Sequence, residues 1–251
     1  MFKTKAIAAA IHLAICVVVA AFVLGIVYAG WYPEALAATQ GIGSILLIVI
    51  VVDVVLGPCL TFLVYKTGKK SLKFDLAAIG LAQFLFLGYG VYTIEQARPA
   101  FLVFVKDRFE PVAISDWAEN DAKRASPEAV SNLFSMKVVA GRLPTDAKEK
   151  EELMFSSAAG GADIHNLPRY YVPYKSLAIA AASRSESIDN LRAINAKSLA
   201  DLNLAVKRLG LPDQDLGFLP LNGRMKDAAV ILRKADGEIL AILPFKAWPE
   251  G

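Results

Sequence analysis

The sequence predicts a membrane protein with three transmembrane α-helices (spans of about 6–29, 42–65 and 76–94) followed by a small α+β domain. Of its 251 residues, 55% are apolar and 20% are charged. Residues 1–94 hold three acidic and six basic side chains, whereas residues 95–251 hold 21 of each sign. This uneven distribution excludes a simple soluble enzyme, a disordered chain and a disulfide scaffold. We therefore expect a membrane region at 1–94 and an exported domain at 95–251.

Each of the three apolar runs is long enough to cross a bilayer, which requires about 20 residues at about 1.5 Å of rise. A cleavable signal peptide is the alternative for the first run, because Lys3 and Lys5 precede it and Val27-Tyr28-Ala29 resembles a cleavage site. The run exceeds the usual ~7–15 apolar residues of such a peptide. We therefore expect the first span to be retained.

Lysines at the ends of the runs predict the orientation, since basic residues near spans stay in the cytoplasm. Lys3 and Lys5 precede the first run, the turn at 66–73 holds four lysines, and the loop at 30–41 has none. The amino terminus and the 66–73 turn are expected inside, and residues 95–251 in the periplasm of a bacterial inner membrane. Lipid is thus an expected partner. No basic stripe with interleaved aromatic residues appears, so nucleic acid is not an expected partner.

Asp53 is the most informative residue of the spans. It lies within the run IVIVVDVVLG that ends at Gly57. A carboxyl at mid-membrane costs about 2.5–3.5 kcal/mol on insertion scales, so it normally faces protein, water or a partner. Gly57 lies on the same helix face, and Pro58 removes the amide that would bond the carbonyl of Val54. These three residues predict a polar point where a second helix can approach closely.

A second interpretation of Asp53 stays open. A protonated Asp53 can simply bond Gln83, Tyr89 or a freed carbonyl inside the protein's own three-helix bundle. His12 can also pair with it, although by helical rise it lies roughly 9 Å shallower. Small residues in the first and third spans favour packing among these helices.

The exported domain is predicted to mix helices and strands. Residues 101–105 form an apolar, β-branched strand, and Ser187–Leu209 forms one long or two short helices with a capping box at Ser198 and Asp201. A hairpin ends the chain, and its edge strand offers a further partner contact. Further expected segments are helices at 116–124, 127–136 and 145–155, a loop at 156–173, and hairpin strands at 228–234 and 239–245.

Catalytic motifs are absent from the sequence. Cys16 and Cys59 both lie in spans, and His165 is the only histidine after residue 94. No GxSxG, HExxH, CxxC or Walker-type motif occurs. Asp163, Asp213 and Asp215 resemble ordinary solvated loop carboxylates more than metal ligands. We expect no enzyme, no cofactor and no metal.

The block from Asp53 to Val112 resembles the TfpX/TfpZ family of type IV pilin accessory proteins. The similarity lies in Asp53–Thr61, in the lysine turn leading to Lys73-Phe74-Asp75-Leu76, in Ala97-Arg98-Pro99 and in Asp107-Arg108-Phe109. The resemblance implies an inner-membrane protein that assists or modulates pilus assembly, with the cognate major pilin and other assembly proteins as partners. It implies no catalysis.

This resemblance suggests a mechanism in which Asp53, Gly57 and Pro58 contact the apolar helix of the pilin, while the exported domain contacts the pilin's soluble head. Pilin helices carry a buried acid, so one of the two carboxyls has to be protonated. A membrane-bound sensor or regulator stays open, although the expected inside segments leave no room for an output module. A membrane enzyme acting through Asp53 and His12 is a third alternative.

The predicted topology has a direct test. A reporter enzyme that is active only in the periplasm should be active when fused after Trp248, because three crossings place that residue outside. Activity of a cytoplasmic reporter at the same position would overturn the orientation, and recovery of the chain from the aqueous fraction would overturn the spans.

Overall fold

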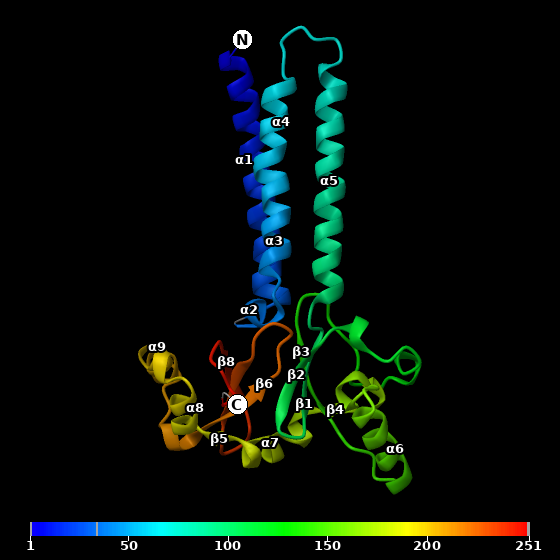
Figure 1. Ribbon diagram of the computed structural model, residues 1–251, viewed down its shortest axis with the longest axis vertical. Helices are drawn as coiled ribbons and strands as arrows, with labels where there is room; N and C mark the ends of the chain where they lie inside the picture. Colours follow the sequence, from blue (N-terminus) through cyan, green and yellow to red (C-terminus); the bar gives the residue numbers. More distant parts are fainter. Residues whose placement is uncertain (1, 34, 250–251) are drawn as a thin grey trace. The chain divides into compact units, whose positions relative to one another are not determined.

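The computed structural model describes residues 2–33 and 35–249 and divides into two compact units. The helical unit contains residues 1–30 and 42–96, and the sheet unit contains residues 31–41 and 97–251. Figure 1 shows long helices in the first and a strand-rich fold in the second. The expected fold class, three apolar helices followed by a domain of mixed helices and strands, is confirmed.

Three long helices lie side by side in the helical unit (Figure 1). Their lengths are 30, 22 and 26 residues, and each is apolar enough to cross a membrane. The three predicted spans are therefore confirmed as apolar helices of spanning length. The first consists of α1 (Phe2–Ile26) and the π-helical η1 (Val27–Trp31), the second of α3 (Gly43–Ile50), the π-helical η2 (Val51–Leu56) and α4 (Gly57–Val64), and the third of α5 (Leu72–Ala97).

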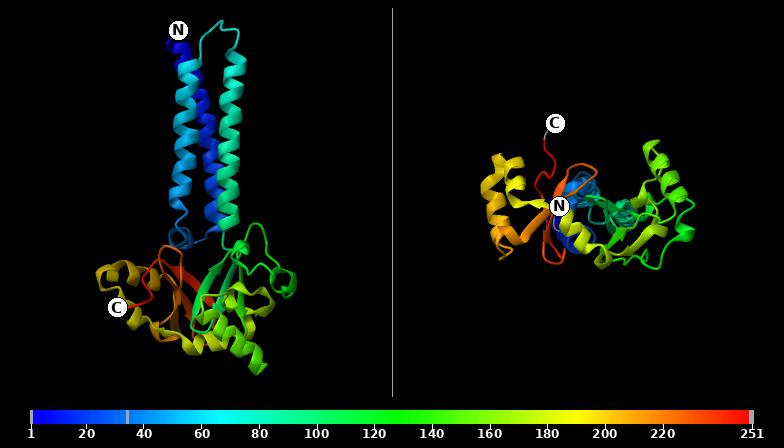
Figure 2. Two further views of the ribbon diagram at one scale, coloured as in Figure 1. Left: turned by 45° about the vertical axis from the view of Figure 1, so that its right-hand side comes forward. Right: turned by 90° about the horizontal axis from the view of Figure 1, so that it is seen from below.

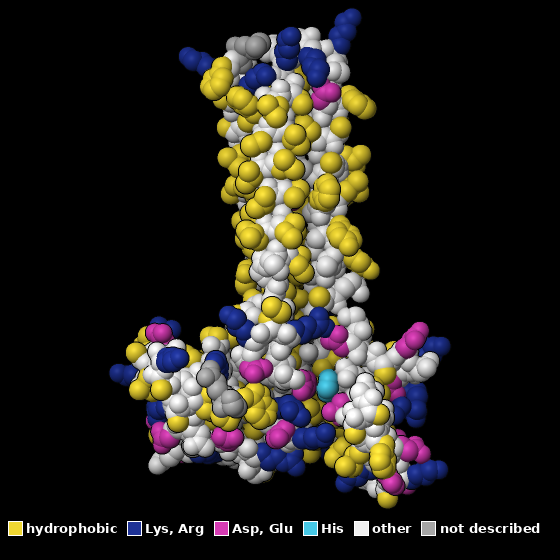
Figure 3. All heavy atoms as spheres, viewed as in Figure 1, with side chains coloured by type: hydrophobic (Ala, Val, Ile, Leu, Met, Phe, Trp, Pro, Cys, Tyr) yellow, Lys and Arg dark blue, Asp and Glu magenta, His cyan; other side chains and the backbone are white. Residues whose placement is uncertain are grey.

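The outer surface of the helical unit is strongly apolar. Hydrophobic side chains cover it along its length, and basic side chains gather at the end that carries the 66–71 turn (Figure 3). Large side chains such as Phe22, Ile48 and Phe84 are 69%, 65% and 71% exposed. Water-soluble proteins rarely expose apolar surface on this scale, whereas lipid tails solvate it well. The unit is therefore suited to a bilayer.

The sheet unit is built on one mixed eight-stranded sheet with the order β4-β3-β1-β2-β6-β7-β8, and β5 pairs with β6. The β1–β3 and β2–β6 pairs are parallel, and the others are antiparallel. The strands are β1 (Phe101–Val105), β2 (Arg108–Val112), β3 (Lys137–Gly141), β4 (Tyr171–Pro173), β5 (Glu186–Ser187), β6 (Leu216–Leu221), β7 (Ala228–Arg233) and β8 (Ile239–Leu243).

Two hydrophobic cores stabilise this sheet, one in each half. Phe101, Val103 and Val139 belong to the first, which includes Leu153 of α6 (Ala147–Ala158). Phe218 and Ile231 belong to the second, which includes residues of α8 (Ile188–Ile194) and α9 (Leu199–Lys207). Figure 2 shows α6 and the α8–α9 pair at opposite ends of the sheet. The halves join where Phe109 pairs with Leu221, and the N–H of Asn222 donates to the carbonyl of Phe109 at 3.0 Å.

The segment between the first two spans packs into the sheet unit rather than forming a free loop. It contains α2 (Leu36–Gln40), in which Leu36 is fully buried. The N–H of Met225 donates to the carbonyl of Thr39 at 2.8 Å, and the indole of Trp31 donates to the carbonyl of Leu133 at 2.8 Å. The chain therefore enters the sheet unit twice, first at residues 31–41 and again after residue 96.

Several local expectations are confirmed. The strand at 101–105, the helix near 145–155 and the terminal hairpin are present, and Ser187–Leu209 forms two short helices. The helix expected at 127–136 is wrong, since that stretch is turns and a single bridge between Asn132 and Ser135. The stretch at 116–124 holds only 3₁₀ turns, and Ser198 makes no side-chain cap.

The loop expected at 156–173 contains ordered structure, because β4 ends it. Five strands and two helices were not expected from the sequence, namely β2, β3, β4, β5, β6, α2 and α7 (Ala178–Arg184). Each is short, and the strands are held by pairing with residues far away in the chain.

Candidate functional site

Asp53, Gly57 and Pro58 come together in the second long helix, and all three are buried inside the helical unit. The side chain of Asp53 is 7% exposed although it lies at mid-span. Gln83 of α5 and Cys16 of α1 approach from the neighbouring helices. We call Cys16, Asp53, Gly57, Pro58 and Gln83 the polar cluster.

The π-helical stretch η2 determines which backbone carbonyl loses its partner. The N–H of Gly57 donates to the carbonyl of Val52, five residues earlier. In the same register the next donor, for the carbonyl of Asp53, would be residue 58, which is a proline without an N–H. The freed carbonyl is therefore that of Asp53. The carbonyl of Val54, which α-helical counting predicts to be free, is not the one that Pro58 leaves without a donor.

Gln83 supplies the missing donor from another helix. Its Nε2 donates to the carbonyl of Asp53 at 3.0 Å and lies 3.6 Å from the Sγ of Cys16. A Cβ on Gly57 would collide with the amide end of Gln83, so only glycine leaves room for it there. Pro58 thus frees the carbonyl, Gly57 leaves space beside it, and Gln83 forms one interhelical hydrogen bond to it.

The other expected partners of Asp53 lie elsewhere. The Nδ1 of His12 is 2.6 Å from the Oγ1 of Thr61, and the side chain of Tyr89 is 71% exposed. The Oδ1 of Asp53 and the Oε1 of Gln83 are buried, and neither has a hydrogen-bond partner among the described residues. The cluster can therefore still accept hydrogen bonds from a group that reaches it. Its role in docking a second protein stays a prediction.

No group of three or more His, Cys, Asp or Glu side chains within residues 2–33 and 35–249 is placed to hold a metal ion. Asp163 accepts a bond from the N–H of Ile164 and lies 3.6 Å from the Nζ of Lys106. Asp213 pairs with Arg192 at 2.7 Å. These carboxylates have structural partners, as solvated loop acids commonly do.

A polar cavity of about 470 Å³ in the sheet unit contains two titratable groups that the sequence did not bring together, Glu110 and His165. Glu110 is 8% exposed, and burial raises its pKa to about 7 although Arg108 and Asn222 each lie 3.3 Å from its carboxylate. Burial lowers the pKa of His165, whose Nδ1 has no partner among the described residues. Near neutral pH the cavity therefore holds a neutral imidazole and a half-protonated carboxyl.

Comparison with known proteins gives a consistent set of relatives. The chain is 30% identical over 232 residues to the fimbrial assembly protein of serogroup I and to that of serogroup E1 from Dichelobacter nodosus. In both cases 89% of each chain is covered. A third protein from that organism, the fimbrial assembly protein of serogroups C1 and C2, is 31% identical over 108 residues, 42% of this chain and 82% of its own. No family model and no solved structure matches.

The packing of Gly57 against Gln83 predicts a non-additive pair of substitutions. Gly57→Ala displaces the Gln83 amide, and Gln83→Ala removes it, so each leaves the Asp53 carbonyl unpaired at a cost of about 1–2 kcal/mol. The double variant should lose no more stability than Gln83→Ala alone. Unfolding of the detergent-solubilised chain measures this. Gly88→Ala is the matched control, since a Cβ there contacts nothing within 4 Å; additive losses would contradict the shared bond.

Burial of Glu110 predicts that stability falls as pH rises. Because the folded pKa of about 7 lies above the ordinary 4.5, the folded state binds the proton more tightly. The stabilisation is complete below pH 4.5 and is lost through pH 7, by up to about 3 kcal/mol. Hydrogen exchange of the β2 and β6 amides in the intact chain measures it.

Glu110→Gln should flatten this pH dependence, because glutamine mimics the protonated acid. His165 has an opposite effect, since its lowered pKa means that stability is lost as pH falls. It is the same in parent and variant, so the difference between them isolates Glu110. Equal slopes in the two proteins would contradict the assignment.

Proposed function

Because this chain belongs to the family of the Dichelobacter nodosus fimbrial assembly proteins, we propose that it assists fimbrial assembly as a non-enzymatic accessory of the fimbrial subunit. The subunit is, in this proposal, a type IV pilin, as the resemblance to TfpX/TfpZ proteins implies. The chain acts in the inner membrane, with its sheet unit in the periplasm and its amino terminus inside. It keeps the subunit ready for assembly without changing it covalently, as a chaperone does.

The observation that carries this proposal is the buried polar cluster at mid-span in a chain of this family. A fimbrial subunit with an apolar membrane helix needs a contact that distinguishes it from lipid. An unpartnered carboxyl oxygen inside a membrane is such a contact, because hydrogen bonds are the main specific attraction available there. Asp53, Gly57 and Pro58 are the proposed contact, and Asp53 donates when protonated, which avoids repulsion by an acid of the subunit.

The buried position of these three residues adds a condition to the proposal. The side chain of Gln83 already fills the space beside Gly57. A subunit helix therefore has to approach from the lipid side and reach Asp53 as Gln83 rotates away. A stronger bond from the partner has to replace the one that Gln83 gives to the Asp53 carbonyl.

An enzyme of this family would change the mass of the fimbrial subunit, and the accessory proposed here leaves it unchanged. Mass spectrometry of the subunit from cells with and without the chain separates the two. A sensor would neither change the mass of the subunit nor bind it, and would alter the expression of the subunit instead. Each outcome identifies a different class of protein.

Asp53→Asn tests the membrane contact. The substitution conserves shape and keeps the Gln83 bond to the backbone carbonyl, so the amount of protein in the membrane should not change. Co-purification of the fimbrial subunit should fall about three- to tenfold, the equivalent of about 0.6–1.4 kcal/mol for one intramembrane hydrogen bond. Quantitative pull-down from detergent extracts measures this.

Asp75→Asn is the matched control, since Asp75 lies in the first turn of α5 and pairs with Lys69 at 2.6 Å. It should leave subunit recovery unchanged. Unaltered recovery with Asp53→Asn, together with normal surface fimbriae, would remove Asp53 from the mechanism.

A further inference from the structure

A second hollow of about 410 Å³ opens in the sheet unit where two adjacent parallel strands end. Phe104 lies near the end of β1, and Gly141 is the last residue of β3. Crevices outside the carboxyl ends of parallel strands are the usual ligand sites of open sheets. Gly141 allows Val105 and Ile164 to pack closely at this edge, because a Cβ there would lie 2.9 Å from Val105 and 3.3 Å from Ile164.

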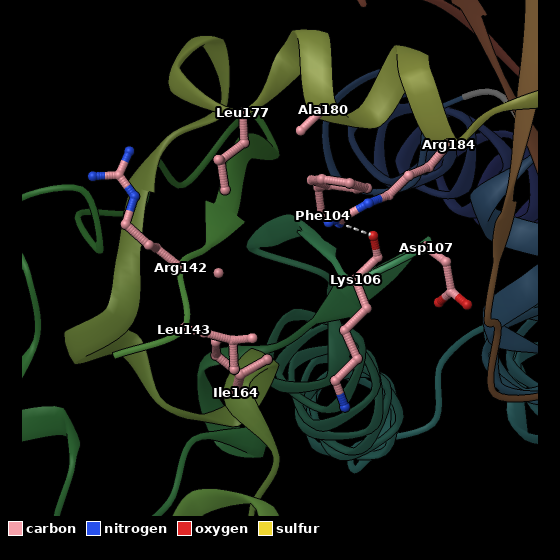
Figure 4. Close-up of a pocket in the computed structure, with 10 residues that line it drawn as sticks. Phe104, Lys106, Asp107, Arg142, Leu143, Ile164, Leu177, Ala180 and Arg184 are labelled. Carbon is pink, nitrogen blue, oxygen red and sulfur yellow. Dashed lines mark hydrogen bonds between the residues drawn. The ribbon is translucent and has the colours of Figure 1, made fainter. Parts of the chain in front are cut away.

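The lining of this hollow combines an apolar centre with a cationic rim. The apolar residues include Phe104, Leu143, Ile164 and Leu177. The charged residues are Lys106, Arg142, Arg184 and one acid, Asp107. In Figure 4 Arg142 and Lys106 stand on opposite sides of the hollow, with Leu143 between them and Phe104 on the side of Lys106. An apolar side chain flanked by carboxylates complements this arrangement.

The cations are held in place by the fold. Lys106 has a φ of 52° and is the only non-glycine residue with a positive φ among those described. This conformation is strained for a residue with a Cβ. The guanidinium of Arg184 donates to the carbonyl of Lys106 and fixes this turn, as Figure 4 shows. Arg142 donates to the Oγ of Ser176 at 3.0 Å, which leaves its other N–H groups available.

Structural roles alone do not account for these basic residues. A glycine at position 106 would form the β1–β2 turn without strain. Lysine there carries a cation at the rim, and among the described residues its Nζ forms an ion pair with Asp163 alone, at 3.6 Å. Arg142 and Arg184 are exposed, so their charges face solvent or a partner. Strained residues that persist in a fold are typically found at binding sites.

We infer that this hollow binds an acidic segment of the fimbrial subunit's soluble domain, with an apolar side chain between Phe104 and Leu143 and carboxylates on Lys106 and Arg142. This inference rests on the function proposed above, and it adds a second contact to the one in the helical unit. Arginine favours such sites because its planar guanidinium can bond a carboxylate through two N–H groups.

Site-specific photocrosslinking in cells that make the intact chain and the subunit tests the inference. A crosslinking residue at position 143, where Leu143 is 36% exposed, should capture the subunit. The captured subunit peptide should contain an apolar residue beside Asp or Glu. The same probe at position 204, where Leu204 is 52% exposed on α9, should not capture it.

Substitutions of the cations should reduce the capture at position 143. Arg142→Glu should lower the yield about tenfold, which corresponds to about 1.4 kcal/mol. Lys106→Gly should also lower it while relieving the positive φ, so a loss of binding cannot be attributed to misfolding. Arg208→Glu is the matched control, since this exposed arginine at the end of α9 makes the same charge change away from the hollow.

The outcomes separate this inference from the proposed function. Unchanged capture with Arg142→Glu and Lys106→Gly, or capture of a subunit peptide without acidic residues, overturns the inference while the proposed function stands. Capture of lipid alone at position 143 also overturns it. If cells lacking the chain assemble normal fimbriae, the proposed function fails and the inference with it.

Discussion

The helical unit depends on a hydrogen bond that its own sequence makes necessary. Pro58 removes a donor in the middle of a helix that is long and apolar enough to cross a bilayer. Hydrocarbon offers no water to replace it, so a donor from another helix stabilises the freed carbonyl by about 1–2 kcal/mol. The amide of Gln83 donates the missing hydrogen bond to the Asp53 carbonyl. This hydrogen bond therefore ties the third long helix to the second.

This constraint explains why residues that look unrelated in sequence occur together. The π-helical register leaves the carbonyl of residue 53 without a backbone donor, and glycine at 57 leaves space for the Gln83 amide. The Nε2 of Gln83 donates a hydrogen bond to that carbonyl. Its Oε1 and the Oδ1 of Asp53 stay unpaired within the described chain. A stable bundle would ordinarily eliminate both. Their retention at one depth is what makes the cluster a candidate for recognition rather than a purely structural device.

Much of this arrangement is predictable from the sequence, and the remainder fails for identifiable reasons. Long apolar runs predict spanning helices because length and hydropathy alone determine them. Asp53, Gly57 and Pro58 are unusual in an apolar run, and they predict the position of the polar cluster. Counting in α-helical register predicts that the freed carbonyl is that of Val54, because no sequence pattern indicates a π-helical register. The helix expected at 127–136 is absent, and β3 and β6 were missed, because pairing with distant residues decides such short segments.

The two proposed contacts differ in how visible they were beforehand. Asp53 stands out because charge is rare in apolar runs, whereas Lys106, Arg142 and Arg184 are ordinary basic residues until β1, β3 and α7 bring them to one hollow. The same holds for Glu110 and His165, which are 55 positions apart in a chain that folds them into one cavity. Sites made of common residues from separate elements require the fold before they can be recognised.

The chain passes between the two units more than once. Residues 31–41 leave the first long helix and return to the second, and between these ends they are held by the backbone bond from Met225 to Thr39 and by the indole bond of Trp31. Residues 31–41 therefore belong to the sheet unit although they join the first two long helices, so the division of the chain into units does not follow its sequence order.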